Sequence, residues 1–385
     1  MQKIAILRGG GLGDFIFTLP ALAALRLRYP DAEIVLLGQA WHAAFLAGRP
    51  GPIDRVVVLP PARGVSLLDT VPAPPGAQTA QDAFFAAMQD EQFDLAIQLH
   101  GGGRYSNPFI RRLGARWTVG LKTPDAEPLD AWVPYVYFQP EVLRYLEVVA
   151  LVGASSPAVL EPRLVVTAAD LAEARRAVPH LPLDGAPDAA PLVVLHPGAG
   201  DGRRRWPPKH FAIVADALRA AGASVAIVGV DAERPLAASV ASAMCIQAEN
   251  LCGRLSLGGL AGLLARSGVM IGNDSGPLHL AGAVGAPTVG IYWCGNLINA
   301  GPMTRARHRP LPAWRLACPA CGADVIRARC DHEVSYTADV SPEEVLAAGC
   351  ELLALPPRDS PRPTRGGRAG PAPSPRLRVG RVAAD

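Results

Sequence analysis

The sequence predicts an α/β protein built from two Rossmann-like domains, whose parallel sheets face each other across a cleft. Short, fully apolar runs alternate with helical segments, as in parallel sheets that are covered on both faces. The pattern stops in a segment rich in Pro, Ala and Asp, residues 179–191, and then restarts. The 385 residues therefore divide into two halves of similar size, each long enough for its own core.

In the N-terminal half, four apolar runs are expected to form strands. A Pro/Gly-rich loop, residues 60–76, follows the third run. The expected strands are KIAILR, EIVLLG, RVVVLP and FDLAIQLH, and the expected helices end near Tyr29 or span residues 40–46 and 80–90.

The C-terminal half repeats this pattern. Its expected strands are LVVLH, SVAIVGV, GVMIGN and PTVGIYW, and its expected helices span residues 208–221, 234–243, 257–266 and 277–285. Ser341 and Glu344 form a capping box for a last helix, which is expected to pack back across the domains. The predicted division is an N-terminal domain at 1–178, a linker at 179–191, a C-terminal domain at 192–340, the last helix at 341–355 and a tail at 356–385.

Charge and composition exclude some classes of protein. The tail carries seven Arg and two Asp, a local charge of +5, so a net charge of +3 leaves about −2 for the rest. The globular part is therefore not a basic nucleic-acid binder, and the Pro/Gly/Arg-rich tail is expected to be disordered. Residues 275–304 hold no charged side chain, but Gly, Pro and Asn interrupt them, which favours buried core over a membrane span. Seven Cys, an odd number, favour reduced thiols and the cytoplasm.

Four glycines follow the first expected strand, in RGGGLGDF. A dinucleotide-binding turn needs Gly-x-Gly-x-x-Gly, but counted from Gly9 the last position is Asp14, and counted from Gly11 it is Ile16. The stretch also lacks the Gly-Lys-Ser/Thr of a P-loop. Two interpretations of Asp14 are open. It stabilises the start of the next helix, or it is a general base that Gly11 and Gly13 leave accessible to a substrate.

A second turn, LHPGAGDGRRRWPPKHF, places three consecutive arginines beside a helix start. Both features suit a phosphate; the alternative is a solvated basic loop. Further on, GNDSGPLH sets Ser275 and Gly276 between a strand and a helix, where their N–H groups can reach a diphosphate. His279 lies in the first turn of that helix, where a core histidine is the alternative.

Three stretches together resemble glycosyltransferase family 9, the family of the ADP-heptose:lipopolysaccharide heptosyltransferases: ILRGGGLGDFIFTLPALAALRLRYPDA, LHPGAGDGRRRWPPKHFAIVADAL and GNDSGPLHLAGAVGAPTVGIYW. The resemblance covers roughly residues 1–355. It implies a GT-B fold, with the acceptor on the N-terminal domain and the nucleotide-sugar on the C-terminal one. It also implies an inverting, metal-independent transfer of a sugar, with ADP-heptose as the expected donor, to a lipopolysaccharide core or related glycan.

The resemblance assigns roles to residues in both domains. Asp14 matches the catalytic carboxylate of the family's Gly-Asp turn, which takes the acceptor's proton. Arg204 stands where the family usually has a phosphate-binding lysine. The other residues implied at the donor site are Arg205, Asp274, Ser275, Gly276 and His279 around the diphosphate, His196 and Gly198 in the same cleft, and Asp231 or Glu233 at the ribose. The resemblance implies no cofactor for catalysis, and its lipid-linked acceptor implies peripheral contact with the inner face of the inner membrane.

Two segments depart from the family pattern. After GIYW the chain continues as CGNLINAGPMTRARHRP, which favours a family 9 transferase with a different nucleotide sugar or acceptor. A nucleotide-sugar-binding protein without activity is a further alternative, although it would not need Asp14. Next, CPACGADVIRARCDH has the spacing of a structural zinc site formed by Cys318, Cys321, Cys330 and His332. Unpaired thiols and a redox-sensitive pair are the alternatives.

Overall fold

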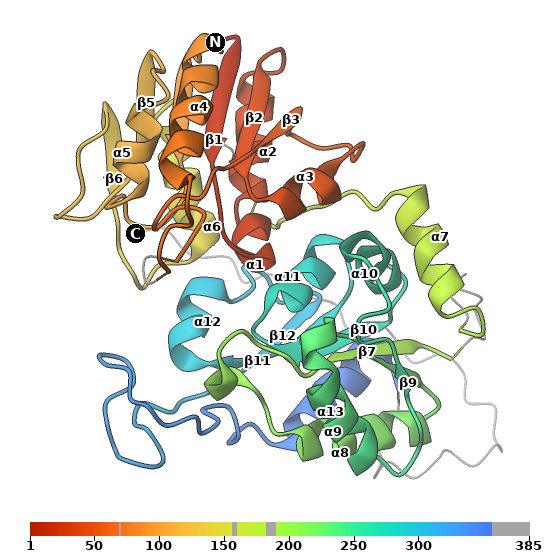
Figure 1. Cartoon of the computed structure of the whole chain (residues 1–385). Helices are drawn as coiled ribbons and strands as arrows, with labels where there is room; N and C mark the ends of the chain where they lie inside the picture. The colour runs from red at the N-terminus through yellow and green to blue at the C-terminus, as the bar shows by residue number, and fades with distance from the viewer. Residues whose placement is uncertain (69–70, 156–159, 182–189, 356–385) are drawn as a thin grey trace, which may run out of the picture.

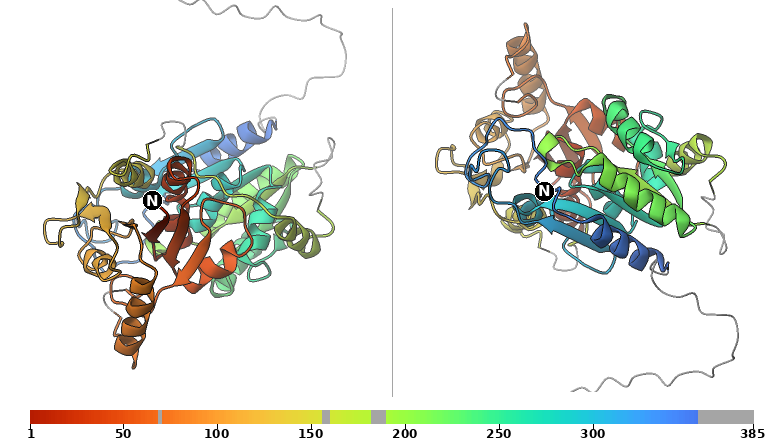
Figure 2. Two further views of the ribbon diagram at one scale, coloured as in Figure 1. Left: turned by 90° about the horizontal axis from the view of Figure 1, so that it is seen from above. Right: turned by 90° about the horizontal axis from the view of Figure 1, so that it is seen from below.

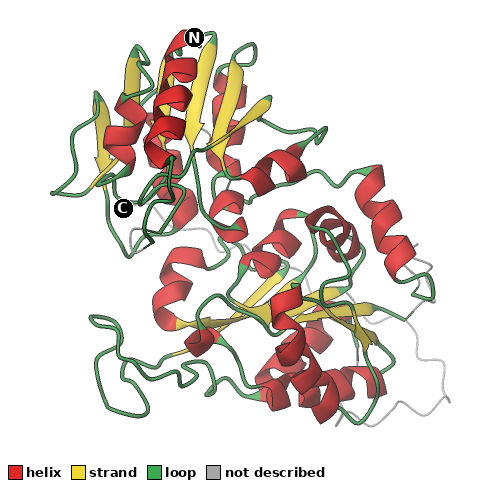
Figure 3. Cartoon of the chain, in the orientation of Figure 1, coloured by secondary structure: helices red, strands yellow, loops and turns green. Residues whose placement is uncertain are grey.

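The structure is a computed structural model that describes residues 1–68, 71–155, 160–181 and 190–355. The chain forms two α/β halves, one above the other in Figure 1, and helices lie against the sheet of each half (Figure 3). The predicted tail, residues 356–385, and residues 182–189 of the predicted linker lie outside the described residues.

The six strands of the N-terminal sheet all run parallel, in the order β3-β2-β1-β4-β5-β6. Along β1, Ile4 and Ile6 pack with α2 and α6, whereas Ala5 and Leu7 pack with the cluster that includes α4 and α5. Both faces of the sheet are covered, which is why this strand is apolar throughout. The elements are β1 (Lys3–Leu7), α1 (Leu12–Ile16), α2 (Leu19–Arg28), β2 (Glu33–Gly38), α3 (Ala40–Leu46), β3 (Arg55–Val58), α4 (Ala77–Asp90), β4 (Leu95–Gln98), α5 (Ser106–Arg111), β5 (Trp117–Lys122), β6 (Ala131–Pro134) and α6 (Glu141–Ala150).

The C-terminal sheet repeats this topology, in the order β12-β11-β10-β7-β8-β9, again with all strands parallel. Counted from its own first strand, β7, the order is the same as in the N-terminal sheet. Both are therefore doubly wound, Rossmann-type sheets. The elements are α7 (Ala168–Ala177), β7 (Leu192–His196), α8 (Pro208–Ala220), β8 (Ser224–Ile227), α9 (Arg234–Ala243), β9 (Glu249–Asn250), α10 (Leu257–Leu264), β10 (Val269–Asn273), α11 (Gly276–Ala283), β11 (Thr288–Trp293), α12 (Cys294–Ala300), β12 (His308–Ala313) and α13 (Pro342–Leu353).

All eight predicted strands are present, but the sequence did not predict β5, β6, β9 and β12. These four lie at or next to a sheet edge, where the apolar pattern is weaker. β12 contains Pro310 and Pro312, which cannot donate hydrogen bonds and are tolerated only at an edge. β9 is only two residues long.

Helix α7 precedes the predicted linker but packs against α10 of the C-terminal half. The chain reaches that half before α7, because the Leu164 N–H donates to the Ala283 carbonyl at 2.9 Å. Arg49, which follows α3, forms an ion pair of 2.6 Å with Asp170 of α7, and their side chains are only 4% and 7% exposed. This pair joins α7 to the N-terminal half as well. The predicted boundary between the domains stays a prediction.

Helix α13 begins after Ser341, whose hydroxyl accepts a hydrogen bond from the Glu344 N–H at 3.2 Å. We expected this helix to pack back across the domains. Its principal contacts are instead with α8 and with β10, β11 and β12 of the C-terminal sheet, along which it lies in Figure 2. Val345 and Ala348, on the apolar face of α13, are buried against this sheet and are part of the C-terminal core.

None of the described helices combines the length and apolarity needed to cross a bilayer. The uncharged run at residues 275–304 forms α11, β11 and α12 of the C-terminal half. The interpretation of this run as α/β core therefore agrees with the structure.

We expect Arg49→Ala to lower the free energy of unfolding by about 3 kcal/mol, because it leaves the buried Asp170 carboxylate without its cation. Urea denaturation followed by circular dichroism measures this change. Arg55→Ala is the control: Arg55 pairs with Glu33 and Glu91, but all three side chains are 22–35% exposed, so the loss should stay within about 1 kcal/mol. Equal losses in the two variants would contradict the structural role of the buried pair.

Candidate active site

The residues predicted for catalysis and donor binding lie near the topological switch point of each sheet, together with others that the sequence did not reveal. In the N-terminal sheet, β1 and β4 are neighbours, and Asp14 and His100 follow their carboxyl ends. In the C-terminal sheet, β7 ends in His196, and Asp274 follows the neighbouring strand β10. Ligands of doubly wound sheets bind in this crevice. The fold therefore provides one such crevice on each side of the interface between the halves.

Asp14 lies in the first turn of α1, with its side chain 50% exposed. One carboxylate oxygen, Oδ2, accepts a hydrogen bond from the Gly11 N–H at 2.9 Å. The other, Oδ1, lies 3.0 Å from Nη2 of Arg8. The hydrogen bond from Gly11 is the contact expected if Asp14 stabilises the start of α1. The contacts also orient a carboxylate that stays open to solvent.

A cavity of about 240 Å³ opens beside Asp14 and is lined by Arg8, His100, Tyr135, Arg144 and Tyr145, among others. Arg8 is buried; burial opposes its charge, but Tyr145, Asp14 and Glu141 outweigh it and keep its pKa above the ordinary value. Burial and the nearby Arg8 lower the pKa of His100 to about 4. This histidine is therefore neutral near pH 7.

Sequence reasoning missed Arg8 and His100. Each follows an apolar strand directly and precedes glycines, in ILRGGG and QLHGGG. A polar side chain at the carboxyl end of a buried strand was the available signal, because the ends of neighbouring parallel strands meet at one sheet edge.

The two halves meet where α1 packs against α11. The rings of Phe17 and His279 lie 4.6 Å apart between their centroids. A Cβ atom added to Gly13 would lie 3.0 Å from Cδ2 of His279, and one added to Gly276 would lie 2.8 Å from Cβ of Leu12. The lack of a side chain at Gly13 therefore lets the C-terminal half approach closely. Gly11 is exposed, and a Cβ added to it would meet only its neighbour Asp14.

Asp274 is the buried centre of the C-terminal site. Its Oδ2 accepts hydrogen bonds from Arg204 at 2.9 Å and from the Asn296 amide at 2.8 Å. Its Oδ1 lies 3.0 Å from Nε2 of His279. Burial alone would raise the pKa of Asp274, but His279, Arg204 and Asn296 together lower it. The carboxylate thus positions three side chains at the start of α11.

His196 connects two more of the predicted residues. Its Nδ1 lies 3.1 Å from the Ser275 hydroxyl, and its Nε2 lies 3.3 Å from Oε2 of Glu233. Burial raises the pKa of Glu233, but His196, the Val230 N–H and Arg205 together outweigh burial, and the net shift is downward. Gly198 has no room for a side chain, because an added Cβ would lie 1.8 Å from Oε1 of Glu233.

These residues border a cavity of about 290 Å³ in the C-terminal half. Its polar lining includes His196, Glu233 and Ser275, and its apolar lining includes Leu255 and Leu260. Carboxylate and hydroxyl groups on one side and apolar surfaces on the other match the ribose and base of a nucleoside.

Two predicted binding residues take up other contacts in the structure. Arg205 donates from Nε and Nη2 to the Ala199 carbonyl, at 3.0 and 2.9 Å. Asp231 is largely exposed and pairs with Arg234. Of the two candidates for the ribose, only Glu233 lines the 290 Å³ cavity.

Asn273 is a positioning residue that the sequence did not reveal. Its side-chain oxygen accepts from the Trp206 N–H at 2.9 Å, and its amide donates to the Pro197 carbonyl at 2.7 Å. It is fully buried, as is Trp206. Asn273 thereby joins the loop after β7, which carries the arginines, to the end of β10.

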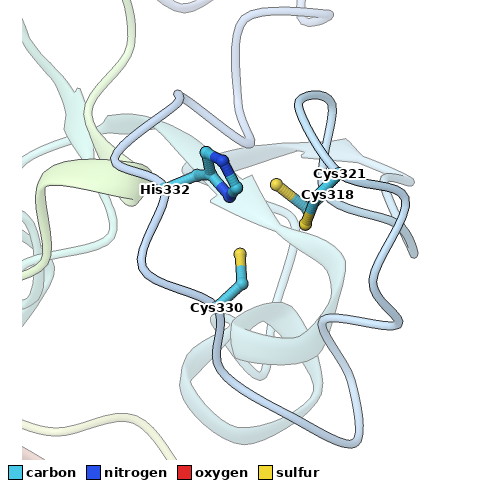
Figure 4. A group of neighbouring side chains, drawn as sticks. All are labelled: Cys318, Cys321, Cys330 and His332. Carbon is cyan, nitrogen blue, oxygen red and sulfur yellow. The ribbon is translucent and has the colours of Figure 1, made fainter.

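The cysteines of CPACGADVIRARCDH converge with a histidine in one loop (Figure 4). The three thiol sulfurs and a ring nitrogen of the four residues lie within 4.8 Å of one another. Cys318 and Cys321 lie in one tight turn. The Gly322 N–H closes it by donating to the Cys318 carbonyl at 2.9 Å, and Gly322 has a φ of +72°. The set is Cys318, Cys321, Cys330 and His332.

Two Rossmann-type sheets with facing switch-point sites form the GT-B architecture. The model of glycosyltransferase family 9 (heptosyltransferase) matches residues 82–309, and the chain belongs to this family. The match includes the residues around Asp274 but begins after Asp14 and ends before Cys318.

Similar proteins cover almost the whole chain. A lipooligosaccharide heptosyltransferase 2 from Haemophilus influenzae is 26% identical over 373 residues, which is 92% of this chain and 100% of that protein. A family 9 glycosyltransferase structure from Veillonella parvula superposes with a TM-score of 0.74 at 21% identity, covering 92% of this chain and 97% of the other. The structure of E. coli ADP-heptose lipopolysaccharide heptosyltransferase II superposes with a TM-score of 0.69 at 19% identity. The superposition covers 92% of this chain and 99% of the other.

Asp274→Asn should lower the free energy of unfolding at pH 7 by about 2 kcal/mol, because it removes the charge that Arg204 and His279 face. The pKa of Asp274 is lowered on folding, so its contribution is present above the ordinary value near 4 and is lost as the pH falls further.

Urea denaturation of both proteins between pH 7 and pH 3 measures this effect. The difference between wild type and Asp274→Asn should shrink as the pH falls below about 4. A difference that grew on acidification would contradict the assigned direction of the pKa shift.

Proposed function

We propose that the protein transfers heptose from ADP-heptose to a lipopolysaccharide core or related glycan, with inversion and without a catalytic metal. The observation that carries this proposal is the packing of α1 on α11, which sets Asp14 of one half beside the Asp274 site of the other. The names of the similar heptosyltransferases support the substrate class. Family membership excludes the alternative of a protein that only binds nucleotide sugars.

We assign the nucleoside to the 290 Å³ cavity. Glu233 would accept hydrogen bonds from the ribose hydroxyls, and Leu255 and Leu260 would contact the base. Ser275 and Gly276, at the start of α11, border the same cavity and would offer their N–H groups to the diphosphate. Arg205 is assigned an indirect role, because its guanidinium holds the Ala199 carbonyl of the same loop.

Negative charge develops on the diphosphate as the sugar leaves. Arg204 and the N–H groups at the start of α11 are placed to stabilise it. In the structure Arg204 pairs with Asp274, so the guanidinium is held in position before the donor arrives. Arginine offers a planar fork where lysine would offer a point charge, which suits two phosphate oxygens at once.

Asp14 is the proposed general base. It would take the proton of the acceptor hydroxyl while that oxygen attacks the anomeric carbon from the face opposite the diphosphate. Arg8 and the Gly11 N–H hold the carboxylate, and the 240 Å³ cavity beside it provides space for an acceptor sugar. Gly11 would leave the approach to this carboxylate free, and Gly13 would let the two halves come together.

A different donor sugar is the second candidate. The segment CGNLINAGPMTRARHRP, which departs from the family pattern, forms α12, and its Asn296 contacts Asp274 directly. The departure therefore lies at the proposed donor site. A panel of nucleotide sugars assayed for turnover decides between ADP-heptose and another donor.

The acceptor class implies where the reaction takes place. A lipid-linked core would be met in the cytoplasm, at the inner face of the inner membrane, by peripheral contact.

We also propose that the Cys₃His group binds a structural zinc ion. Tetrahedral zinc with Zn–S bonds of about 2.3 Å requires sulfurs about 3.8 Å apart, and the ligand atoms already lie within 4.8 Å of one another. The backbone and ring of His332, and then Cys318, lower the pKa of Cys330 to about 6. Cys330 is thus a thiolate near pH 7, which is the form that binds metal. This site lies outside the proposed chemistry and would stabilise its loop.

Asp14→Asn should lower kcat about 1000-fold, because the amide cannot accept the proton, while ADP binding stays within about twofold. Arg204→Ala should show the opposite pattern, with ADP affinity reduced at least tenfold. Steady-state kinetics with ADP-heptose and calorimetry with ADP measure the two effects. Asp82→Asn, an exposed carboxylate on α4, is the control. Unchanged turnover in Asp14→Asn would exclude this residue as the base.

Purified protein should contain a single zinc ion by elemental analysis, and Cys330→Ser should lose it. A chelator should lower the melting temperature of wild type but not of Cys330→Ser, because only wild type has metal to lose. Cys245→Ser, at an exposed cysteine outside the group, should retain the metal. Wild-type protein that neither contains zinc nor gains stability from added zinc would overturn the site.

A further inference from the structure

A third cavity, of about 390 Å³, lies between the Cys/His loop and the N-terminal half. We define the Cys/His loop as residues 318–336. Its Arg327 and Arg329 form one wall of the cavity, and Tyr137 and Phe138, between β6 and α6, form the opposite wall. The 290 Å³ cavity assigned to the nucleoside and the 240 Å³ cavity beside Asp14 are separate from it, so its occupant is still to be assigned.

The cavity carries excess positive charge. Arg203 is neutralised by Asp201, which it binds through two of its nitrogens. Among the described residues, Arg327 pairs with Asp324 alone, at 3.6 Å, and both side chains are more than half exposed. Arg329 forms no ion pair or hydrogen bond within the part of the chain that the structure describes. The Cys/His loop therefore presents two weakly compensated guanidinium groups to the cavity.

The opposite wall is aromatic and open. Tyr137 is 60% exposed and Phe138 is 43% exposed, and their rings pack edge to face with centroids 4.9 Å apart. Aromatic faces pack well against the C–H face of a sugar ring, and arginine forks bind carboxylate or phosphate groups. The combination suits a sugar that carries an anionic group.

The position of the cavity decides which substrate can fill it. Arg204 and Asn296 border it on the side of the proposed diphosphate site. Tyr135, two residues before Tyr137, lines the cavity beside Asp14. The segment at residues 135–138 therefore contributes side chains to both cavities. An acceptor longer than one sugar could occupy both.

We propose that the Cys/His loop is an acceptor-recognition element: Arg327 and Arg329 bind an anionic sugar of the acceptor, next to the sugar that Asp14 deprotonates. This inference rests on the proposed glycosyl transfer. Hydrogen bonds attach the end of the loop to the segment after β7, because the Tyr336 N–H donates to the Arg203 carbonyl at 2.6 Å and the Ser335 hydroxyl donates to the Arg205 carbonyl at 2.7 Å. The ligand class is a carboxylate- or phosphate-bearing saccharide.

The test is calorimetric binding of deacylated lipopolysaccharide core oligosaccharides, truncated before each heptose, to the full-length chain. Arg327→Ala/Arg329→Ala should weaken binding of the core about tenfold or more, because charge-assisted contacts are lost. ADP affinity should stay within about twofold. Dephosphorylated and carboxyl-reduced cores distinguish phosphate from carboxylate as the recognised group. The core that lacks this group should bind wild type weakly. Its affinity should match that of the intact core for Arg327→Ala/Arg329→Ala.

Arg112→Ala/Arg116→Ala is the matched control, since these arginines lie near the amino end of β5, away from the carboxyl ends of the strands. Unchanged core binding in Arg327→Ala/Arg329→Ala, or an equal loss of ADP binding, would overturn the inference. Failure of every core to bind wild type would do the same. Cores that bind wild type without heptose transfer would refute the proposed function alone, and the two variants would still decide the inference.

Discussion

The contact between α1 and α11 is the constraint on which the site depends. Gly13 and Gly276 lack side chains where a Cβ would meet the opposite half, so the helices that follow the first N-terminal strand and the fourth C-terminal strand approach closely. Each helix follows a strand at a switch point. Packing of the two helices therefore places the exposed Asp14 near the site formed by the buried Asp274 carboxylate and its partners.

The two carboxylates differ because their surroundings differ. Asp274 is buried and its oxygens contact Arg204, Asn296 and His279, so it acts as a fixed centre that positions these three side chains. Asp14 is half exposed, and its contacts with Arg8 and Gly11 orient it without enclosing it. Only a carboxylate of the second kind can reach a proton on an incoming substrate. The division of roles thus follows from burial rather than from residue type.

The sequence predicted the central strands of both sheets and most of the donor-side cluster, because both depend on local signals. Apolar runs mark buried parallel strands, and GNDSGPLH places its polar residues at one helix start. The sequence did not predict edge strands such as β12. Pro310 and Pro312 argue against a strand in the sequence, but an edge strand tolerates them because it pairs with a neighbouring strand on one side only. The contact of Arg205 with Ala199 and the link made by Asn273 depend on how distant loops pack, which no local pattern encodes.

In the proposed role of the Cys/His loop, a structural group affects recognition without taking part in chemistry. Arg327 and Arg329 are exposed side chains whose guanidinium groups lose conformational freedom on binding a ligand. A zinc ion bound to Cys318, Cys321 and Cys330 would lower that entropic cost, because it would fix the backbone that carries the arginines before the ligand binds. A ligand ion in this group would therefore act on acceptor affinity and leave the donor site, held by Asp274 and α11, unchanged.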